Sequence, residues 1–368
     1  MQRLINFFKD ETVLIISVFL AIISSFFITP SMEYVDYIDF KVLVCLFCLM
    51  IVVSGFKRMN ILEIISQKLL NKVTSLRKMY ITIIFLTFIS AMLITNDVAL
   101  ITFVPLTITI LKMSEKSEHI ILFVVLQTIA ANLGSSLTPV GNPQNLYLFS
   151  YYNFDTYSFF AVTLPIVLAS FVLLFLCVFL IKNEDLIIKI DSIIKVENKI
   201  KSFIYLILFI LSVLCVFNIV PYIVSLLIVI VIVLLLDKGL FKEVDYSLLI
   251  TFVGFFIFVG NMSNIEALKN FFANALHNKE LISSILVSQV ISNVPAAILL
   301  SKFTHSAQEI LLGVNIGGLG TLIASLASVI SFKIYCKEKE INKGKYLMIF
   351  TVYNLIFLAI LTIFSLIL

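Results

Sequence analysis

The stretch ANLGSSLTPVGNPQN, residues 131–145, interrupts a long apolar part of the chain. It contains two Gly, two Pro, three Asn, two Ser and one Thr, whereas the flanking segments ILFVVLQTIA and LYLFSYYNF are mainly apolar. Gly and Pro are the residues least suited to the interior of a helix. The stretch therefore predicts a break inside a helix that would otherwise continue.

The composition of the whole chain is that of a membrane protein. Its 368 residues are 61% hydrophobic and 13% charged, and the mean hydropathy is +1.13; a soluble protein carries about 25% charged residues. About 20 apolar residues cross a bilayer. Apolar runs recur at residues 13–29, 39–55, 79–94, 98–111, 119–131, 160–181, 202–218, 221–236, 246–260, 281–291, 308–330 and 346–368. No small-residue cleavage site follows the first run, which predicts a retained span.

The positions of Lys and Arg predict how the chain is threaded, because these residues collect in cytoplasmic loops. They cluster in segments 57–78, 182–201 and 333–345, and are absent from 30–40 and 146–158. If residues 79–111 and 281–302 each enter and leave the membrane on one face, 22 of the 26 positive residues fall on the inside. We therefore expect two re-entrant hairpins and a cytoplasmic N-terminus.

A similar amphipathic segment precedes each expected hairpin. NILEIISQKLLNKV (60–73) and NIEALKNFFANAL (264–276) have apolar residues at helical spacing and charges on the opposite side. Such a pattern is typical of helices that lie in the membrane interface. We expect interfacial helices within residues 57–78 and 262–278; ordinary loop helices are the alternative.

The opening stretch also has a counterpart later in the chain. NLGSSLTPVGNPQN (132–145) aligns without gaps with NIGGLGTLIASLAS (315–328), with identities at Asn132, Gly134 and Thr138. Each copy follows a hairpin with a polar centre, ITNDVAL (94–100) or ISNVPAA (291–297). Residues 202–218 add one extra span between the copies, which reverses the direction of the second.

These observations predict an all-α polytopic membrane protein built as an inverted-topology repeat, with two re-entrant hairpins and two broken transmembrane helices. The first repeat is expected at residues 1–181, with a cytoplasmic-side hairpin at 79–111 and a broken helix at 119–153. Residues 182–218 would form a linker and the orientation-reversing span. The second repeat is expected at 219–368, with an outside hairpin at 281–302 and a broken helix at 308–332.

Broken helices at membrane depth indicate a transporter. Backbone that leaves a helix there must be buried in protein or line a cavity, and paired breaks in an inverted repeat mark a substrate site. No phosphate-binding loop and no paired-Asp, Ser/His or His-Glu-x-x-His motif is present, so neither an ATP-driven pump nor an enzyme is expected. A net charge of +4 does not indicate nucleic-acid binding. A channel or a passive uniporter is the alternative function that the sequence does not separate from a coupled transporter.

At the hairpin tips TND and SNV, followed by SLTPVGNPQN and GLGTLIASLAS, the sequence resembles the ion transporter superfamily. The likeness covers about residues 39–368 and is to divalent anion/sodium symporters, citrate-transporter-like permeases, and arsenite-efflux and sodium/proton antiporter (ArsB/NhaD-like) families. It implies a transport domain of hairpins and broken helices that moves, elevator-like, against a homodimeric scaffold in the bilayer.

The resemblance also implies site residues. A first cation site would use Thr95, Asn96 and the backbone of Gly141. A second would use Ser288, Asn293 and the backbone of Ala324. Substrate would contact Asn96, Asp97, Asn142, Asn293 and Ser325. The dicarboxylate carriers have Ser-Asn-Thr at both tips, whereas the third positions here are Asp97 and Val294. This argues against a di- or tricarboxylate substrate, and TNDVALI is closer to the arsenite-efflux pattern.

The chemistry of these residues suits a small anion or a neutral oxyacid. No Lys or Arg falls in an expected span core, so an anion would be held by amides, hydroxyls and helix N-termini. Asp97 is the acid expected near mid-membrane, where acids are usually functional; capping a helix is its alternative role. We expect an anion permease with no cofactor and with sodium or protons as coupling ion. A cation/proton antiporter or an arsenite-type exporter is the alternative. Cys45 and Cys48 share a helix face, and buried structural thiols are expected there.

Overall fold

The computed structural model describes residues 11–70, 73–186, 197–338 and 342–368. Within these ranges the chain is all-helical apart from one isolated bridge between Ser75 and Asp185. Eight of the described helices are long and apolar enough to cross a membrane: α4 (Phe40–Arg58), α6 (Leu76–Ile94), α7 (Asn96–Met113), α8 (Ile120–Ser135) with the short turn η1 (Ser117–His119), α10 (Thr156–Phe179), α11 (Lys199–Val216), α13 (Tyr246–Ser263) and α19 (Lys343–Ile367).

The remaining described helices are shorter. They are α2 (Thr12–Ser25), α3 (Glu33–Tyr37), α5 (Ile61–Leu70), α9 (Pro143–Tyr151), α12 (Tyr222–Leu236), α14 (Glu266–Leu276), α15 (Glu280–Ile291), α16 (Asn293–Ser301), α17 (Ala307–Gly317) and α18 (Leu326–Tyr335), with the 3-10 turns η2 (Lys238–Lys242) and η3 (Leu322–Ala324). The helix formed by the first apolar run is shorter than the expected span at residues 13–29, because α2 ends at Ser25 after 14 residues. At about 1.5 Å per residue it covers about 21 Å.

Several expected segments fall partly outside the described residues. Residues 71–72 belong to the expected interfacial segment 57–78, and 187–196 belong to the expected linker 182–218. The described part of the first segment contains α5, and that of the linker contains the whole of α11. The second interfacial segment, 262–278, contains α14. The expected cytoplasmic position of the N-terminus concerns residues 1–10, which also lie outside the described ranges.

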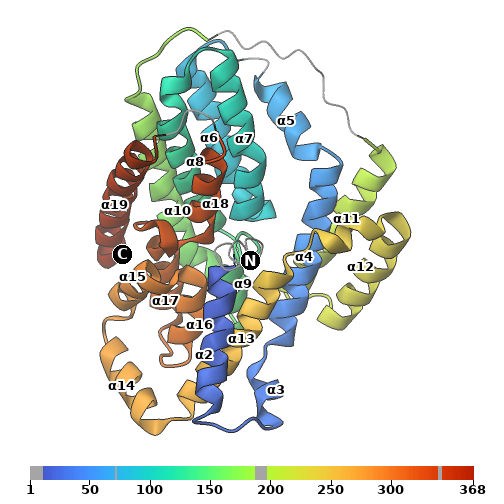
Figure 1. The fold of residues 1–368 in the computed structure, drawn as a ribbon, viewed down its shortest axis with the longest axis vertical. Coiled ribbons are helices and arrows are strands. Elements are labelled where there is room, and N and C mark those ends of the chain that lie inside the picture. The colour runs from blue at the N-terminus through green and yellow to red at the C-terminus, as the bar shows by residue number, and fades with distance from the viewer. Residues whose placement is uncertain (1–10, 71–72, 187–196, 339–341) are drawn as a thin grey trace, which may run out of the picture.

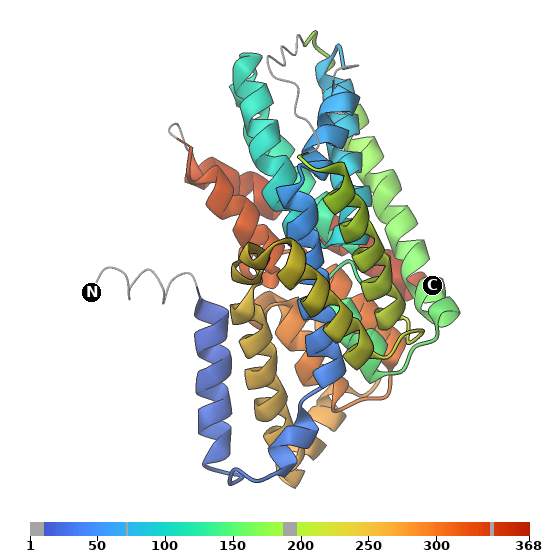
Figure 2. The same cartoon turned by 90° about the vertical axis from the view of Figure 1, so that its right-hand side faces the viewer.

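Two groups of helices lie at opposite ends of the molecule. Helices α6, α7 and α8 occupy the upper part of Figure 1, and α14, α15, α16 and α17 occupy the lower part. Within each group the packing is alike: α6 packs against α7 and α8, and α15 packs against α16 and α17. Turned by 90°, the molecule shows α2, in dark blue, beside the gold α13 in its lower half, in agreement with their extensive contact (Figure 2).

Glycine allows close helix contacts in both groups. A Cβ atom at Gly134 on α8 would lie 2.2 Å from the carbonyl oxygen of Phe88 on α6. A Cβ atom at Gly317 on α17 would lie 2.8 Å from the Ser288 side chain and 3.0 Å from Cα of Ile285, both on α15. Real Cβ contacts are not this short, so these positions require Gly for the helices to approach as they do.

Several helix contacts cross between the two halves of the chain. Helix α9 packs against α16, and α18 packs against α7. In addition, α2 packs against α13, and α12 packs against α4. The short helix that follows each break therefore lies against a hairpin helix from the other half of the chain.

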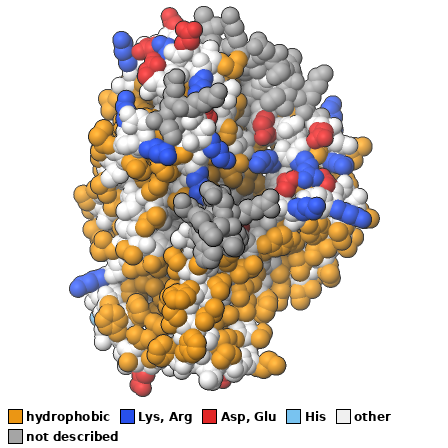
Figure 3. Space-filling model, in the orientation of Figure 1, with side chains coloured by type: hydrophobic (Ala, Val, Ile, Leu, Met, Phe, Trp, Pro, Cys, Tyr) orange, Lys and Arg blue, Asp and Glu red, His pale blue; other side chains and the backbone are white. Residues whose placement is uncertain are grey.

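The surface has a polar and an apolar region. On the face shown in Figure 3, Lys and Arg side chains gather over the upper part and at the ends of α4, α11 and α12, whereas hydrophobic side chains dominate the lower part. Many of the exposed large hydrophobic side chains belong to α10, α11, α12 and α19. Such an apolar surface is that of a protein surrounded by lipid rather than water.

Candidate functional site

Two one-residue turns connect consecutive helices, and their backbones have nearly the same conformation. Thr95, between α6 and α7, has φ 79° and ψ 149°. Ser292, between α15 and α16, has φ 76° and ψ 155°. Positive φ is uncommon for residues other than Gly and for a β-branched Thr it is strained, at a cost of about 1–3 kcal/mol. Strain of this kind is concentrated at functional sites.

Each turn is bonded to the break that follows it in the chain. The backbone N–H of Asn96 donates to the carbonyl oxygen of Gly141 at 3.1 Å. The Ser292 hydroxyl donates to the carbonyl oxygen of Ala324 at 3.3 Å. Both expected cation sites therefore have a carbonyl oxygen beside the turn, although in each case that oxygen already accepts a bond from the turn.

In each break a residue with extended backbone directly precedes the next helix, and in the first break its side chain also caps that helix. Helix α8 ends at Ser135, and α9 restarts after Asn142, whose side-chain oxygen accepts from the backbone N–H of Asn145 at 2.8 Å. Pro143 occupies the first turn of α9, where its missing N–H costs nothing. In the second break, Ser325 has the same extended backbone as Asn142 and directly precedes α18.

A buried network of amides joins the two breaks. Asn132 on α8 accepts from the Ser325 hydroxyl at 2.9 Å and donates to the Ser328 hydroxyl at 3.4 Å. Asn315 on α17 accepts from the Asn142 amide at 3.2 Å and donates to the Asn145 side-chain oxygen at 2.7 Å. These side chains are at most 4% exposed. Each of these two Asn residues is thus bonded to the break of the other half.

The structure brings most of the predicted site residues to this network or beside it. Asn96 donates to Asn132 at 3.2 Å. Asn293 begins α16 and is buried next to the turn residue Ser292. Ser288, an expected cation ligand, points back along α15, where its hydroxyl donates to the carbonyl oxygen of Ser284 at 2.7 Å. That hydroxyl lies against Gly317 of α17.

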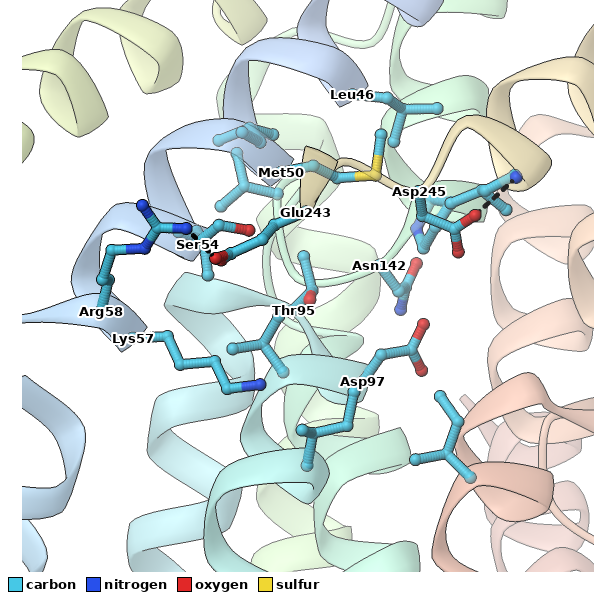
Figure 4. A pocket seen from close by; sticks show the side chains of 18 of the residues that line it. Leu46, Met50, Ser54, Lys57, Arg58, Thr95, Asp97, Asn142, Glu243 and Asp245 are labelled. Atoms are coloured by element: carbon cyan, nitrogen blue, oxygen red, sulfur yellow. Dashed lines mark hydrogen bonds and ion pairs between the residues drawn. The ribbon is translucent and has the colours of Figure 1, made fainter. Parts of the chain in front are cut away.

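A cavity of about 620 Å³ opens beside the first turn and the first break. Thr95, Asp97 and Asn142 line it, whereas Asn96, Asn293 and Ser325 do not. Asp97 and Asn142 lie on the same side of this pocket as Asp245 (Figure 4). The Asp97 carboxylate oxygen Oδ1 has no hydrogen-bond partner among the described residues. The volume is typical of a site for a small molecule.

Five charged residues that line the pocket were not predicted from the sequence: Lys57, Arg58, Glu63, Glu243 and Asp245. They come from the end of α4, from α5 and from the connection before α13. In the sequence, the basic cluster around residue 57 indicated only chain orientation, and Asp245 was not singled out. In the structure Asp245 caps α13 by accepting from the N–H of Leu248 at 2.9 Å.

A second group of ionisable side chains lies away from the pocket. Glu118, His119 and Glu184 have ligand atoms within 4.8 Å of one another. However, Glu184 is hydrogen-bonded to the Lys116 ammonium, which holds the pKa of that carboxyl below its ordinary value. Because Lys116 already neutralises Glu184, we interpret this group as a set of ion pairs.

Cys45 and Cys48 are buried free thiols, as expected. Cys45 lies 3.4 Å from Cys215 of α11, measured between the sulfur atoms, and both side chains are buried. The short contact joins α4 to α11, two helices that pack along each other.

Eight candidate spans among the described helices, and a pocket with charged and amide side chains beside interrupted helices, define a multi-pass membrane protein of the transporter class. A family model described as "Citrate transporter" matches residues 4–324. The chain belongs to this citrate transporter family, whose members are secondary transporters and not enzymes.

Three curated relatives support this assignment. The chain is 34% identical to an uncharacterized transporter of Methanocaldococcus jannaschii over 343 residues, 92% of each protein. It is 28% identical to the inner membrane protein YbiR of Escherichia coli over 303 residues, 81% of this chain and 80% of YbiR. It is 29% identical to a Dictyostelium discoideum protein described as the transporter arsB over 141 residues, 38% of this chain and 24% of that protein.

Proposed function

We propose that the protein is an ion-coupled secondary transporter of a small anion that works by elevator-type alternating access. The observation that carries the proposal is the pocket at the first hairpin turn, where Asp97 and Asn142 meet. The pocket offers a carboxylate oxygen of Asp97 without a partner among the described residues for a cation, and the N-terminus of α9 for an anion. Sodium or a proton would be the coupling ion, and the homodimer that the family resemblance implies would supply the scaffold.

The proposed architecture is an inverted repeat with re-entrant hairpins α6–α7 and α15–α16. The reciprocal bonds of Asn132 and Asn315 support it, since each reaches the break of the other half. The matching conformations of Thr95 and Ser292 support it too. The hairpins also lie at opposite ends of the molecule in Figure 1. We retain the repeats as 1–181 and 219–368, with the linker and extra span at 182–218.

One observation favours the alternative function, a cation/proton antiporter or an arsenite-type exporter. The carboxylates of Glu63, Asp97 and Asp245 line the same pocket and would attract a cation. A channel or passive uniporter would use the same pocket without coupling.

Flux in proteoliposomes separates these possibilities. We expect uptake of a small anion to be driven by an imposed sodium or proton gradient, each tested alone, and to show saturable counterflow. Gradient-independent, non-saturating flux would favour a channel. Proton release coupled to sodium uptake without any anion would favour the antiporter.

The hairpin turns provide a first prediction. Replacing Asn96 or Asn293 by Ala should reduce anion flux at least about tenfold, because Ala has neither the donor nor the acceptor of an amide. Flux per amount of reconstituted protein is the measurement, and a normal size-exclusion profile shows that the variant is folded. Asn198→Ala, which removes an exposed cap of α11 away from the pocket, is the control. Wild-type flux in either turn variant would exclude its Asn from the site.

Chain orientation provides a second prediction. The excess of Lys and Arg around α5 predicts that this helix faces the cytoplasm, with α14 on the outside. A single Cys at Lys68 should therefore react with an impermeant maleimide only in inside-out vesicles, and one at Asn278 only in right-side-out vesicles. Both positions are exposed, and the parent chain controls for its native thiols. Reaction of both from the same side would disprove the inverted repeat.

A further inference from the structure

Lys57 is a cationic side chain of the pocket that has no bonding partner in the described part of the chain. It lies in the last turn of α4 and is exposed. Its side chain extends into the pocket from the side opposite Asp97 and Asn142 (Figure 4). It makes no hydrogen bond or ion pair with a described residue, so its ammonium is available to a ligand.

The neighbouring cation is already neutralised. Arg58 is bonded through its two terminal nitrogens to Asp237 and to Glu243, both in the connection between α12 and α13. A guanidinium held by two carboxylates has little positive charge left to attract an anion. Of the two basic residues that line the pocket, Lys57 is therefore the one that can receive an anionic group.

The acids around Lys57 limit how much negative charge the pocket can accept. Glu63 on α5, Asp97 on α7 and Asp245 before α13 line the same cavity. Burial raises the pKa of the Glu63 carboxyl, while the charge of Lys57 acts in the opposite direction, so the two groups are close enough to interact. A ligand with two or three negative charges would meet one free ammonium and several carboxylates, and like charges in a partly buried pocket repel strongly.

The two sides of the pocket are carried by different helices. Lys57 is carried by α4, which packs against α11 and α12. Asp97 belongs to α7, which packs against α6, α8 and α18, and Asn142 directly precedes α9, which packs against α16 and α17 and also against α4. A ligand bound to Lys57 and to the N-terminus of α9 together would therefore bridge α4 and the helix that follows the first break.

We propose that Lys57 is the substrate-binding cation of this transporter and that the pocket selects a small substrate with a single negative charge, disfavouring di- and tricarboxylates. This inference rests on the proposed function and names the substrate class of its site. It assigns a role to a residue at the end of α4 that otherwise acts only as an orientation signal.

Binding and flux together test the inference. Binding of lactate, nitrate, succinate and citrate to the purified full-length protein is measured by titration calorimetry, and flux of the same four probes is measured in proteoliposomes. We expect lactate or nitrate to bind at least about tenfold more tightly than succinate and citrate. We expect Lys57→Met to weaken binding of the monoanion at least about tenfold, and Lys57→Arg, which keeps the charge, to weaken it less than about threefold.

The controls keep the outcome decisive. Lys68→Met removes an exposed ammonium from α5 outside the pocket and should leave binding unchanged. If Lys57→Met does not fold, the affinity of Lys57→Arg for the monoanion still tests whether the positive charge at this position is used. Tighter binding of succinate or citrate than of both monoanions, or no binding of either monoanion, would overturn the single-charge inference. Unchanged monoanion affinity in Lys57→Met would overturn the role of Lys57. Binding without gradient-driven flux would instead contradict the proposed transport function and leave the role of Lys57 standing.

Discussion

Asp97→Asn should reduce gradient-driven anion uptake at least about tenfold, a loss of about 1.4 kcal/mol or more. The Asp97 carboxylate lines the pocket, and its Oδ1 atom is buried without a hydrogen-bond partner among the described residues. Asn has nearly the same shape and serves equally well near a helix start, but it cannot carry the negative charge or the transferable proton that coupling requires. Exchange of anion without a gradient should survive in part.

The measurement is uptake into proteoliposomes with a sodium gradient, a proton gradient and no gradient. Asp155→Asn is the matched control, since Asp155 caps α10 by accepting from Ser158 and lies outside the pocket. If Asp97→Asn retains gradient-driven uptake within about twofold of the parent protein, Asp97 has only a structural role. The carbonyl oxygens at the two breaks would then be left as the coupling site.

Asn315→Leu should abolish transport and destabilise the protein by about 2–5 kcal/mol. The amide of Asn315 bonds to the side chains of Asn142 and Asn145, and all three are buried. Leu fills a similar volume but leaves two partner amides without one of their bonds, and a buried polar group that loses its partner costs more than the bond itself contributes. The change in stability is measured by fluorescence-detected size-exclusion chromatography, as the temperature at which the heated protein is no longer monodisperse.

Asn354→Leu is the matched control for this variant. Asn354 on α19 is also buried, but its amide donates to the carbonyl oxygen of Phe350 in its own helix, and its Oδ1 has no partner in the described part of the chain. Removing it should cost much less, because no other side chain loses a bond. Equal destabilisation by the two variants would show that the Asn315 bonds contribute nothing specific.

The positions of the breaks and turns could be predicted from the sequence because the signals are local. Asn, Gly, Ser and Pro within apolar runs are visible around residues 132–145, and the polar centre ITNDVAL contains the turn residue Thr95. Family membership was also predictable from these motifs, and the match over residues 4–324 confirms it. The arrangement as an inverted repeat stays a prediction.

The pocket could not be predicted in full, because its walls come from distant parts of the chain. Lys57 and Asp245 are separated by almost 190 residues, yet they line one cavity. Nothing in their local sequence distinguishes them from an orientation signal and a helix cap. The reciprocal bonds of Asn132 and Asn315 were missed for the same reason: alignment made these residues equivalent but said nothing about their partners. Similarly, Cys45 contacts a thiol 170 residues away.

The crossed packing of α9 on α16 and of α18 on α7 has a consequence for biosynthesis. Helix α9 ends at Tyr151, and the helix it packs against begins only at Asn293. At about 5–20 residues per second, the ribosome needs roughly 7–30 s to make the intervening chain. During that interval the polar break between α8 and α9 lacks its partners from the second half of the chain. The nascent first half must then be shielded by the insertion machinery or persist as an intermediate whose break is exposed to lipid. A chain that stops before α16 would be a substrate for membrane proteases rather than a stable half-transporter.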